Sequence, residues 1–146
     1  AVVRAHDGRG PATAITPAIL ADWRLAAPTD LIAKVYQPAI SRAEIAGLAP
    51  LVEQAAAEGD GAATEILQTA GSELADLVRA VATSLGLDQP TPCALAGGVI
   101  LNGPLTRRFF QNAADRDNLR LAPITLVPEP AQGALALARQ LVALPR

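Results

Sequence analysis

Apolar residues recur at every third or fourth position through the middle of the chain, from residue 61 to residue 85. This spacing matches the period of an α-helix, so it predicts one long helix with a continuous apolar face. Its apolar positions are Ile66, Leu67, Ala70, Leu74, Leu77, Val78, Val81 and Leu85. Asp60 is a typical N-cap for this helix, Gly86 closes it, and Gly59 is a typical C-cap for the helix before it.

The first forty residues predict short helices separated by turns. Residues 1–5 resemble the last turn of a helix, which indicates that the chain is part of a longer polypeptide. Residues 6–11 form a turn cluster. Thr16 and Pro17 then predict the start of a helix, with threonine as the N-cap and proline at the first helical position. A further short helix is expected over 29–36.

A longer helix is predicted after Ser41, because Ser41-Arg-Ala-Glu44 has the form of a capping box. Its apolar positions continue at helical spacing toward Gly59. Pro50 falls inside this segment, where a proline is expected to kink the helix. We expect this helix and the long helix that follows it to form an antiparallel hairpin.

The pattern changes beyond residue 88 to short apolar runs alternating with helical segments. The predicted elements are a strand over 93–96, a helix over 104–113, a strand over 124–127 and a last helix over 134–142. This order predicts two adjacent parallel strands. Because two strands do not make a stable sheet alone, the rest of the sheet is expected from sequence outside this chain or from a partner chain. The fold class is therefore helix-rich α/β.

Composition excludes several classes of protein. The chain has 146 residues, enough for one domain, and its core must be aliphatic because aromatic residues make up 3% and Met is absent. A net charge of −2 without a basic run argues against nucleic-acid binding. Cys93 is the single cysteine, so internal disulfides and a cysteine metal cluster are excluded and a reducing cytoplasm fits best. No apolar stretch approaches the roughly 18–20 residues needed to cross a membrane.

The candidate binding feature is the pair Gly97-Gly98, which follows the first predicted strand. A turn without side chains at the carboxyl end of a strand lets a flat ligand approach the backbone, as in nucleotide-binding α/β proteins. The same pair is also typical of a plain, tight strand-to-helix turn. No pair of carboxylates and no Ser/His/Asp set has a spacing that indicates catalysis, so no catalytic or metal-binding residue is predicted.

Four motifs in a fixed order carry a family resemblance. They are Asp7-Gly-Arg-Gly-Pro11, Ala-x-x-Gly59-Asp60-x-x-Ala63, Leu95-Ala-Gly97-Gly98-Val99 and Pro130-x-x-Gly133-Ala134-Leu135-x-Leu-Ala138. The series resembles the carboxyl-terminal half of the BadF/BadG/BcrA/BcrD ATPase family and, within it, N-acetylglucosamine kinases. These belong to the sugar kinase, Hsp70 and actin superfamily, whose two RNase H-like domains close around ATP.

The resemblance implies that residues 1–146 are the adenosine-binding lobe of a two-domain kinase and a partial RNase H-like domain. The amino-terminal lobe, which would hold the phosphate loop, the general base and most contacts to Mg²⁺ and sugar, lies outside this sequence. The implied reaction moves a phosphoryl group from Mg-ATP to the 6-hydroxyl of N-acetylglucosamine or a similar hexose. The implied partners are ATP or ADP, the amino sugar and the missing lobe, and kinases of this type are often homodimers. The chain alone is expected to be inactive.

The resemblance also implies which residues contact ATP. Gly97 and Gly98 would lie against adenine and ribose, Asn102 would hydrogen-bond the nucleotide, and Ala46 would line the other face of the adenine. Gly133 would let the last helix pack closely on the sheet. From the residues alone, Asn102 is equally suited to cap the helix at Pro104, and buried packing is the default for an alanine.

Two other functions stay open. Some members of the same broad family are ATPases that drive electrons into acyl-CoA dehydratases and reductases through a cysteine-ligated iron–sulfur cluster, and one cysteine disfavours this role here. The third hypothesis is a helical interaction module that does not bind nucleotide, with its exposed sheet edge available to a partner.

Overall fold

The computed structural model describes residues 1–143. In this range the elements follow the order α1 (Val2–His6), α2 (Ile15–Trp23), α3 (Asp30–Val35), α4 (Arg42–Ala46), α5 (Ala49–Ala57), α6 (Gly61–Ser84), β1 (Thr91–Ala96), α7 (Gly98–Asn102), α8 (Pro104–Arg116), β2 (Leu121–Val127) and α9 (Ala131–Ala143). The predicted fold class, a helix-rich α/β chain with a short parallel strand pair, is confirmed. No helix among the described residues combines the length and apolar character needed to cross a membrane.

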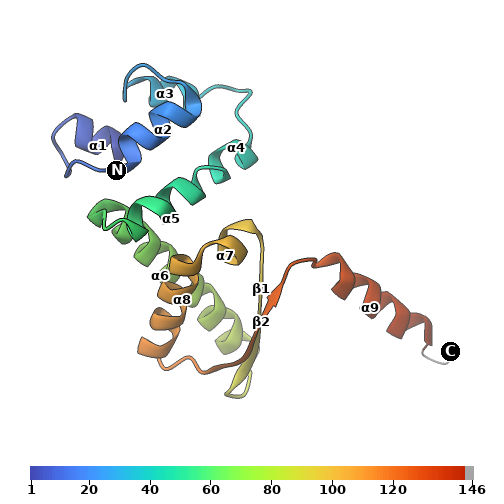
Figure 1. Ribbon diagram of the computed structural model, residues 1–146. Helices are drawn as coiled ribbons and strands as arrows, with labels where there is room; N and C mark the ends of the chain where they lie inside the picture. Colours follow the sequence, from blue (N-terminus) through green and yellow to red (C-terminus); the bar gives the residue numbers. More distant parts are fainter. Residues whose placement is uncertain (144–146) are drawn as a thin grey trace.

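Helix α6 connects the two hydrophobic clusters found among the described residues. Near its start, Ala63 joins a cluster with residues of α1, α2, α3 and α5. Toward its end, Ala75 and Ala82 join a second cluster with β1, α7 and α8, in which Phe110 is fully buried. Figure 1 shows α1 to α3 at one end of α6 and the strands near the other. The predicted long helix is therefore present, and it organises both cores.

A close crossing joins α6 to α8. Gly71 of α6 is buried, and a Cβ at this position would lie 2.6 Å from the backbone carbonyl carbon of Phe109 and from the amide nitrogen of Phe110. Only a residue without a side chain lets the two helices approach this far. Nothing in the local pattern around Gly71 predicts the contact, because its partners are almost forty positions away along the chain.

The sheet consists of β1 and β2, which pair in parallel as predicted. Cys93 to Ala96 face Ile124 to Val127 in register, and the pairing is irregular between Thr91 and Cys93. Helix α8 provides the crossover between the strands. Cys93 is partly buried and packs against a hydrophobic cluster, and this burial raises the pKa of its thiol.

One predicted helix start and the predicted length of another helix are wrong. Helix α2 begins at Ile15 and not at Pro17, because the Thr13 hydroxyl accepts a hydrogen bond from the Ile15 amide at 3.2 Å and fixes the chain two residues earlier. The helix predicted after Ser41 is two helices, since α4 ends at Ala46 and α5 begins at Ala49. Pro50 does not kink a helix but lies in the first turn of α5, where its missing N–H costs no hydrogen bond.

The arrangement of α5 and α6 also differs from the prediction. The two helices contact each other around the turn at Gly59, but they diverge from it at an angle and do not form an antiparallel hairpin (Figure 1). Helix α6 contacts α8 more extensively than it contacts α5.

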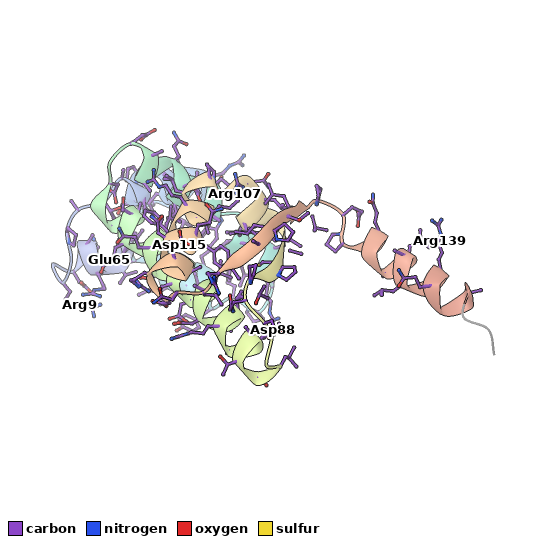
Figure 2. All side chains as sticks on the ribbon, turned by 90° about the horizontal axis from the view of Figure 1, so that it is seen from below. Arg9, Glu65, Asp88, Arg107, Asp115 and Arg139 are labelled. Atoms are coloured by element: carbon purple, nitrogen blue, oxygen red, sulfur yellow. The ribbon has the colours of Figure 1, made fainter. Side chains whose placement is uncertain are left out.

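Helix α9 projects away from the other elements, as both Figure 1 and Figure 2 show, the latter with Arg139 labelled on it. A Cβ added at Gly133 would meet nothing within 4 Å. The close packing of the last helix on the sheet that Gly133 was predicted to allow is therefore not made among the described residues.

Candidate functional site

A pocket of about 320 Å³ lies between the α4–α5 junction and α7, and we call it the α5–α7 pocket. Its lining residues are Ala46, Gly47, Ala49, Pro50, Glu53, Gly98, Val99, Asn102 and Gly103. Three of the four residues predicted to contact ATP, Ala46, Gly98 and Asn102, meet here although about fifty positions separate the two walls. The fourth, Gly97, does not line this pocket.

One wall is built by the break between α4 and α5. The capping box at the start of α4 is complete: the Ser41 hydroxyl accepts a bond from the Glu44 amide at 3.1 Å, and the Glu44 carboxylate accepts one from the Ser41 amide at 2.8 Å. The bond from the Ser41 backbone lowers the pKa of Glu44. Helix α4 ends at Ala46, whose methyl group is exposed and lines the pocket. The default assignment of Ala46 to buried packing is therefore wrong.

The other wall starts at the end of β1. Gly97 has a φ of 102°, a conformation that residues with side chains rarely adopt, and it directs the chain from the strand into α7. Gly98 then opens α7, and both glycines are exposed. They also border a larger apolar groove of about 610 Å³ between α6 and β1. Sequence reasoning missed α7, because five residues are too few to produce a helical pattern.

Asn102 closes α7 and lines the pocket with an exposed side chain. The side-chain nitrogen Nδ2 of Asn102 would lie 4.0 Å from a Cβ added at Gly98, so the two residues are neighbours on the pocket wall. The alternative role of Asn102 as N-cap of α8 is wrong. That position is Gly103, and the first amides of α8 are bonded by a side chain from another helix.

That side chain is Glu53 of α5, which the sequence analysis missed. Its Oε2 accepts a hydrogen bond from the Leu105 amide at 3.1 Å, and its Oε1 accepts one from the Thr106 amide at 2.9 Å and one from the Thr106 hydroxyl at 2.5 Å. The residues next to Glu53 in the sequence do not indicate these contacts, because its partners lie more than fifty positions away.

A second tether holds the far end of α7. The guanidinium group of Arg107, labelled in Figure 2, donates from Nη1 to the carbonyl oxygens of Ile100 at 2.7 Å and Leu101 at 2.6 Å. These carbonyls belong to the last turn of α7, where a helix lacks internal partners. The segment from Gly98 to Gly103 is thus fixed to α8 by bonds to its own backbone.

The chemistry of the lining suits binding and not bond making. The described lining is mostly apolar, with one carboxylate and one carboxamide, and it includes no Lys, Arg or His. Its volume lies at the lower end of the roughly 300–1,000 Å³ usual for small-molecule sites. No group of three potential metal-ligating side chains occurs within residues 1–143. The described lining thus suits a small, largely apolar group with a few polar atoms at its edge.

Comparisons with known proteins show that the chain is similar to one family of ATPases and to kinases of amino sugars. The model of the BadF/BadG/BcrA/BcrD ATPase family matches residues 1–138. The N-acetyl-D-glucosamine kinase of Dictyostelium discoideum is 32% identical over 145 residues, which cover 94% of this chain and 44% of that protein. The N-acetylmuramic acid/N-acetylglucosamine kinase of Clostridium acetobutylicum is 30% identical over 140 residues, 95% of this chain and 46% of that protein. The chain thus spans less than half the length of these relatives. No solved structure matches it.

Proposed function

Since the chain belongs to the BadF/BadG/BcrA/BcrD ATPase family, we propose that residues 1–146 form the adenosine-binding lobe of a two-domain sugar kinase. The observation that carries this proposal is the α5–α7 pocket, which unites Ala46, Gly98 and Asn102 from distant segments. The family implies a nucleotide ligand, and both curated relatives are kinases of amino sugars by name.

In this proposal the adenine base enters between Ala46 and Gly98. Small residues on both sides leave room for a ring, and the carboxamide of Asn102 at the rim offers one donor group and one acceptor to the base or ribose. The phosphates extend beyond the pocket, because its described lining offers them no cationic side chain. The residues that hold the phosphates and Mg²⁺ are therefore expected in the other lobe.

The proposed reaction transfers the γ-phosphoryl group of ATP to the 6-hydroxyl of N-acetylglucosamine or a related hexose, with ADP as the leaving group. Phosphoryl transfer depends mainly on positioning and charge stabilisation, and Mg²⁺ supplies part of that charge when bound. The contribution of this chain is to hold the adenosine end in place, so that closure of the two lobes aligns the reacting groups. A cytoplasmic location follows from the supply of ATP.

The test uses the protein at its full natural length. Isothermal titration with ADP is expected to show binding, and a coupled assay with Mg-ATP is expected to show phosphorylation of N-acetylglucosamine, with N-acetylmuramic acid and glucose as comparison sugars. Binding without phosphorylation of any of these, together with stoichiometric iron, would favour the ATPase-activator hypothesis instead. A titration without heat at several temperatures would overturn nucleotide binding and leave the interaction module.

A further inference from the structure

The Glu53 side chain connects the two walls of the α5–α7 pocket, and we propose that it is a positioning residue that sets the width of this pocket. The inference rests on the proposed function, because it assigns the residue a role in the same nucleotide site. Glu53 extends from α5, which carries one wall, and its carboxylate contacts the start of α8, which directly follows the other wall.

Both carboxylate oxygens of Glu53 are engaged. Leu105 donates its amide to Oε2, and Thr106 donates its amide and its hydroxyl to Oε1. These amides belong to the first turn of α8, where a helix has free N–H groups and favours a negative charge. Thr106 is buried, with 1% of its surface exposed, so its hydroxyl is fixed in place. Three donors therefore hold the carboxylate in one orientation.

The contact reaches the pocket through Gly103, which joins α7 directly to α8. A Cβ at Gly103 would overlap the Glu53 carboxylate and would approach the Val99 carbonyl oxygen to 2.7 Å. The glutamate thus sits against bare backbone at the junction. Because α7 is only five residues long and its last carbonyls are bonded to Arg107, fixing this junction fixes Gly98 and Asn102 relative to α5.

The test compares nucleotide binding by the full-length protein and its Glu53→Gln variant. Glutamine keeps the size of the side chain but places an NH₂ group against an N–H donor, so at least one of the three bonds is lost. We expect the Kd for ADP to rise about tenfold, because a hydrogen bond to a charged group contributes enough free energy for a change of that size. The number of binding sites per chain is expected to stay unchanged.

Two further variants complete the design. Glu58→Gln makes the same chemical change at the exposed end of α5, where the carboxylate accepts a bond from the Gln54 side chain, and its Kd is expected to match the wild type. Thr106→Val removes the hydroxyl donor and is expected to weaken ADP binding, whereas Thr106→Ser retains the donor and is expected to restore most of the affinity.

The outcomes separate a positioning role from a purely structural one. A cap that serves only stability would lower the unfolding midpoint and the number of sites per chain while leaving the Kd unchanged, and that result overturns the inference. If the wild-type protein itself gives no heat with ADP, the proposed function fails. Amide hydrogen exchange over residues 98–103 then tests whether Glu53 holds the two pocket walls together. Faster exchange in Glu53→Gln than in Glu58→Gln supports this connection, and equal rates reject it.

Discussion

At the scale of single residues, Gly98 provides the sharpest test of the pocket. A Cβ here has no neighbour closer than the Asn102 side chain at 4.0 Å, so the fold tolerates a larger residue while the pocket does not. We expect Gly98→Val to weaken ADP binding by the full-length protein at least about tenfold, because the β-branched side chain of valine would occupy the space of the ligand. Thermal stability is expected to change little. Gly61→Val, at the open first position of α6, is the matched control. Unchanged affinity in Gly98→Val would place the nucleotide elsewhere.

Gly71 tests the close crossing of α6 and α8. Replacing a helical glycine by alanine stabilises a helix by about 1 kcal/mol through propensity alone. Here the new methyl group would lie 2.6 Å from backbone atoms of Phe109 and Phe110, and overpacking of this kind costs about 1–3 kcal/mol or more. We expect the overlap to dominate, so Gly71→Ala lowers the free energy of unfolding measured in urea. Gly61→Ala, which meets no neighbour, should be neutral or slightly stabilising, and equal effects of both changes would contradict the crossing.

The hydrogen bonds of the Asp60 carboxylate predict that the stability of the folded chain depends on pH. Its carboxylate accepts bonds from the Ala63 amide at 2.8 Å, the Ala14 amide at 2.6 Å and the Thr13 hydroxyl at 3.0 Å. The bond from Ala63 is the largest cause that lowers the pKa of Asp60 in the folded chain. The folded pKa is below the unfolded value of about 3.9, so the stabilisation is present above that pH and is lost as the pH falls through the folded pKa.

The measurement for Asp60 is the thermal midpoint between pH 7 and pH 2.5. Asp60→Asn is expected to lower the midpoint at pH 7 and to reduce its decline in acid. Asp22→Asn removes the same charge from an exposed position of α2 and serves as the control. Parallel curves for wild type and Asp60→Asn would show that the bonds to Asp60 contribute nothing to folding.

At the scale of elements, the sequence predicted the helix ends that depend on neighbouring residues. It did not predict those that depend on residues far along the chain. The capping box at Ser41 and the N-cap at Asp60 are present as predicted, because each depends on residues within one turn. The start of α2 was missed because Thr13 and Ala14 also bond to Asp60, which is more than forty positions away. The break at Gly47 was missed as well.

The same distinction applies to the candidate site. Ala46, Gly98 and Asn102 were nominated by family resemblance, and the structure brings them together, while their contact with nucleotide stays a prediction. Neither the local sequence pattern nor the family resemblance indicated a role for Glu53. It looks like any polar residue of an amphipathic helix until the fold places it against Thr106.

Two helices of equal length allow a test of how far packing against other elements stabilises a helix in this chain. Helices α8 and α9 each have 13 residues, but α8 packs against α6, whereas α9 projects away with Leu135 and Leu137 more than half exposed. An isolated helix of this length is marginal in water. In the 146-residue chain, amide hydrogen exchange is expected to be much faster in α9 than in α8. Equal protection would mean that α9 has a packing partner in solution.

At the scale of the whole molecule, residues 1–143 form two small cores and a sheet of two strands. Exposed apolar side chains continue along the end of α6 at Leu77 and Val81 and at its C-cap, Leu85. We expect the purified 146-residue chain to show no phosphorylation of N-acetylglucosamine, because the proposed function assigns the phosphate and sugar contacts to the other lobe. The full-length protein, assayed in parallel with Mg-ATP, is the control. Sugar phosphate formed by the 146-residue chain alone would refute this division of roles.

The bond between Glu53 and Thr106 also has a consequence for the order in which the chain is expected to fold. It closes a loop of more than fifty residues, and the entropy of that closure must be offset before the bond forms. Helix α6 lies inside the loop and packs on α8, so this packing brings the two ends together. We therefore expect the α5–α7 pocket to form late, after the long helix has docked, and in a nascent chain only once residues as far along as Thr106 are available.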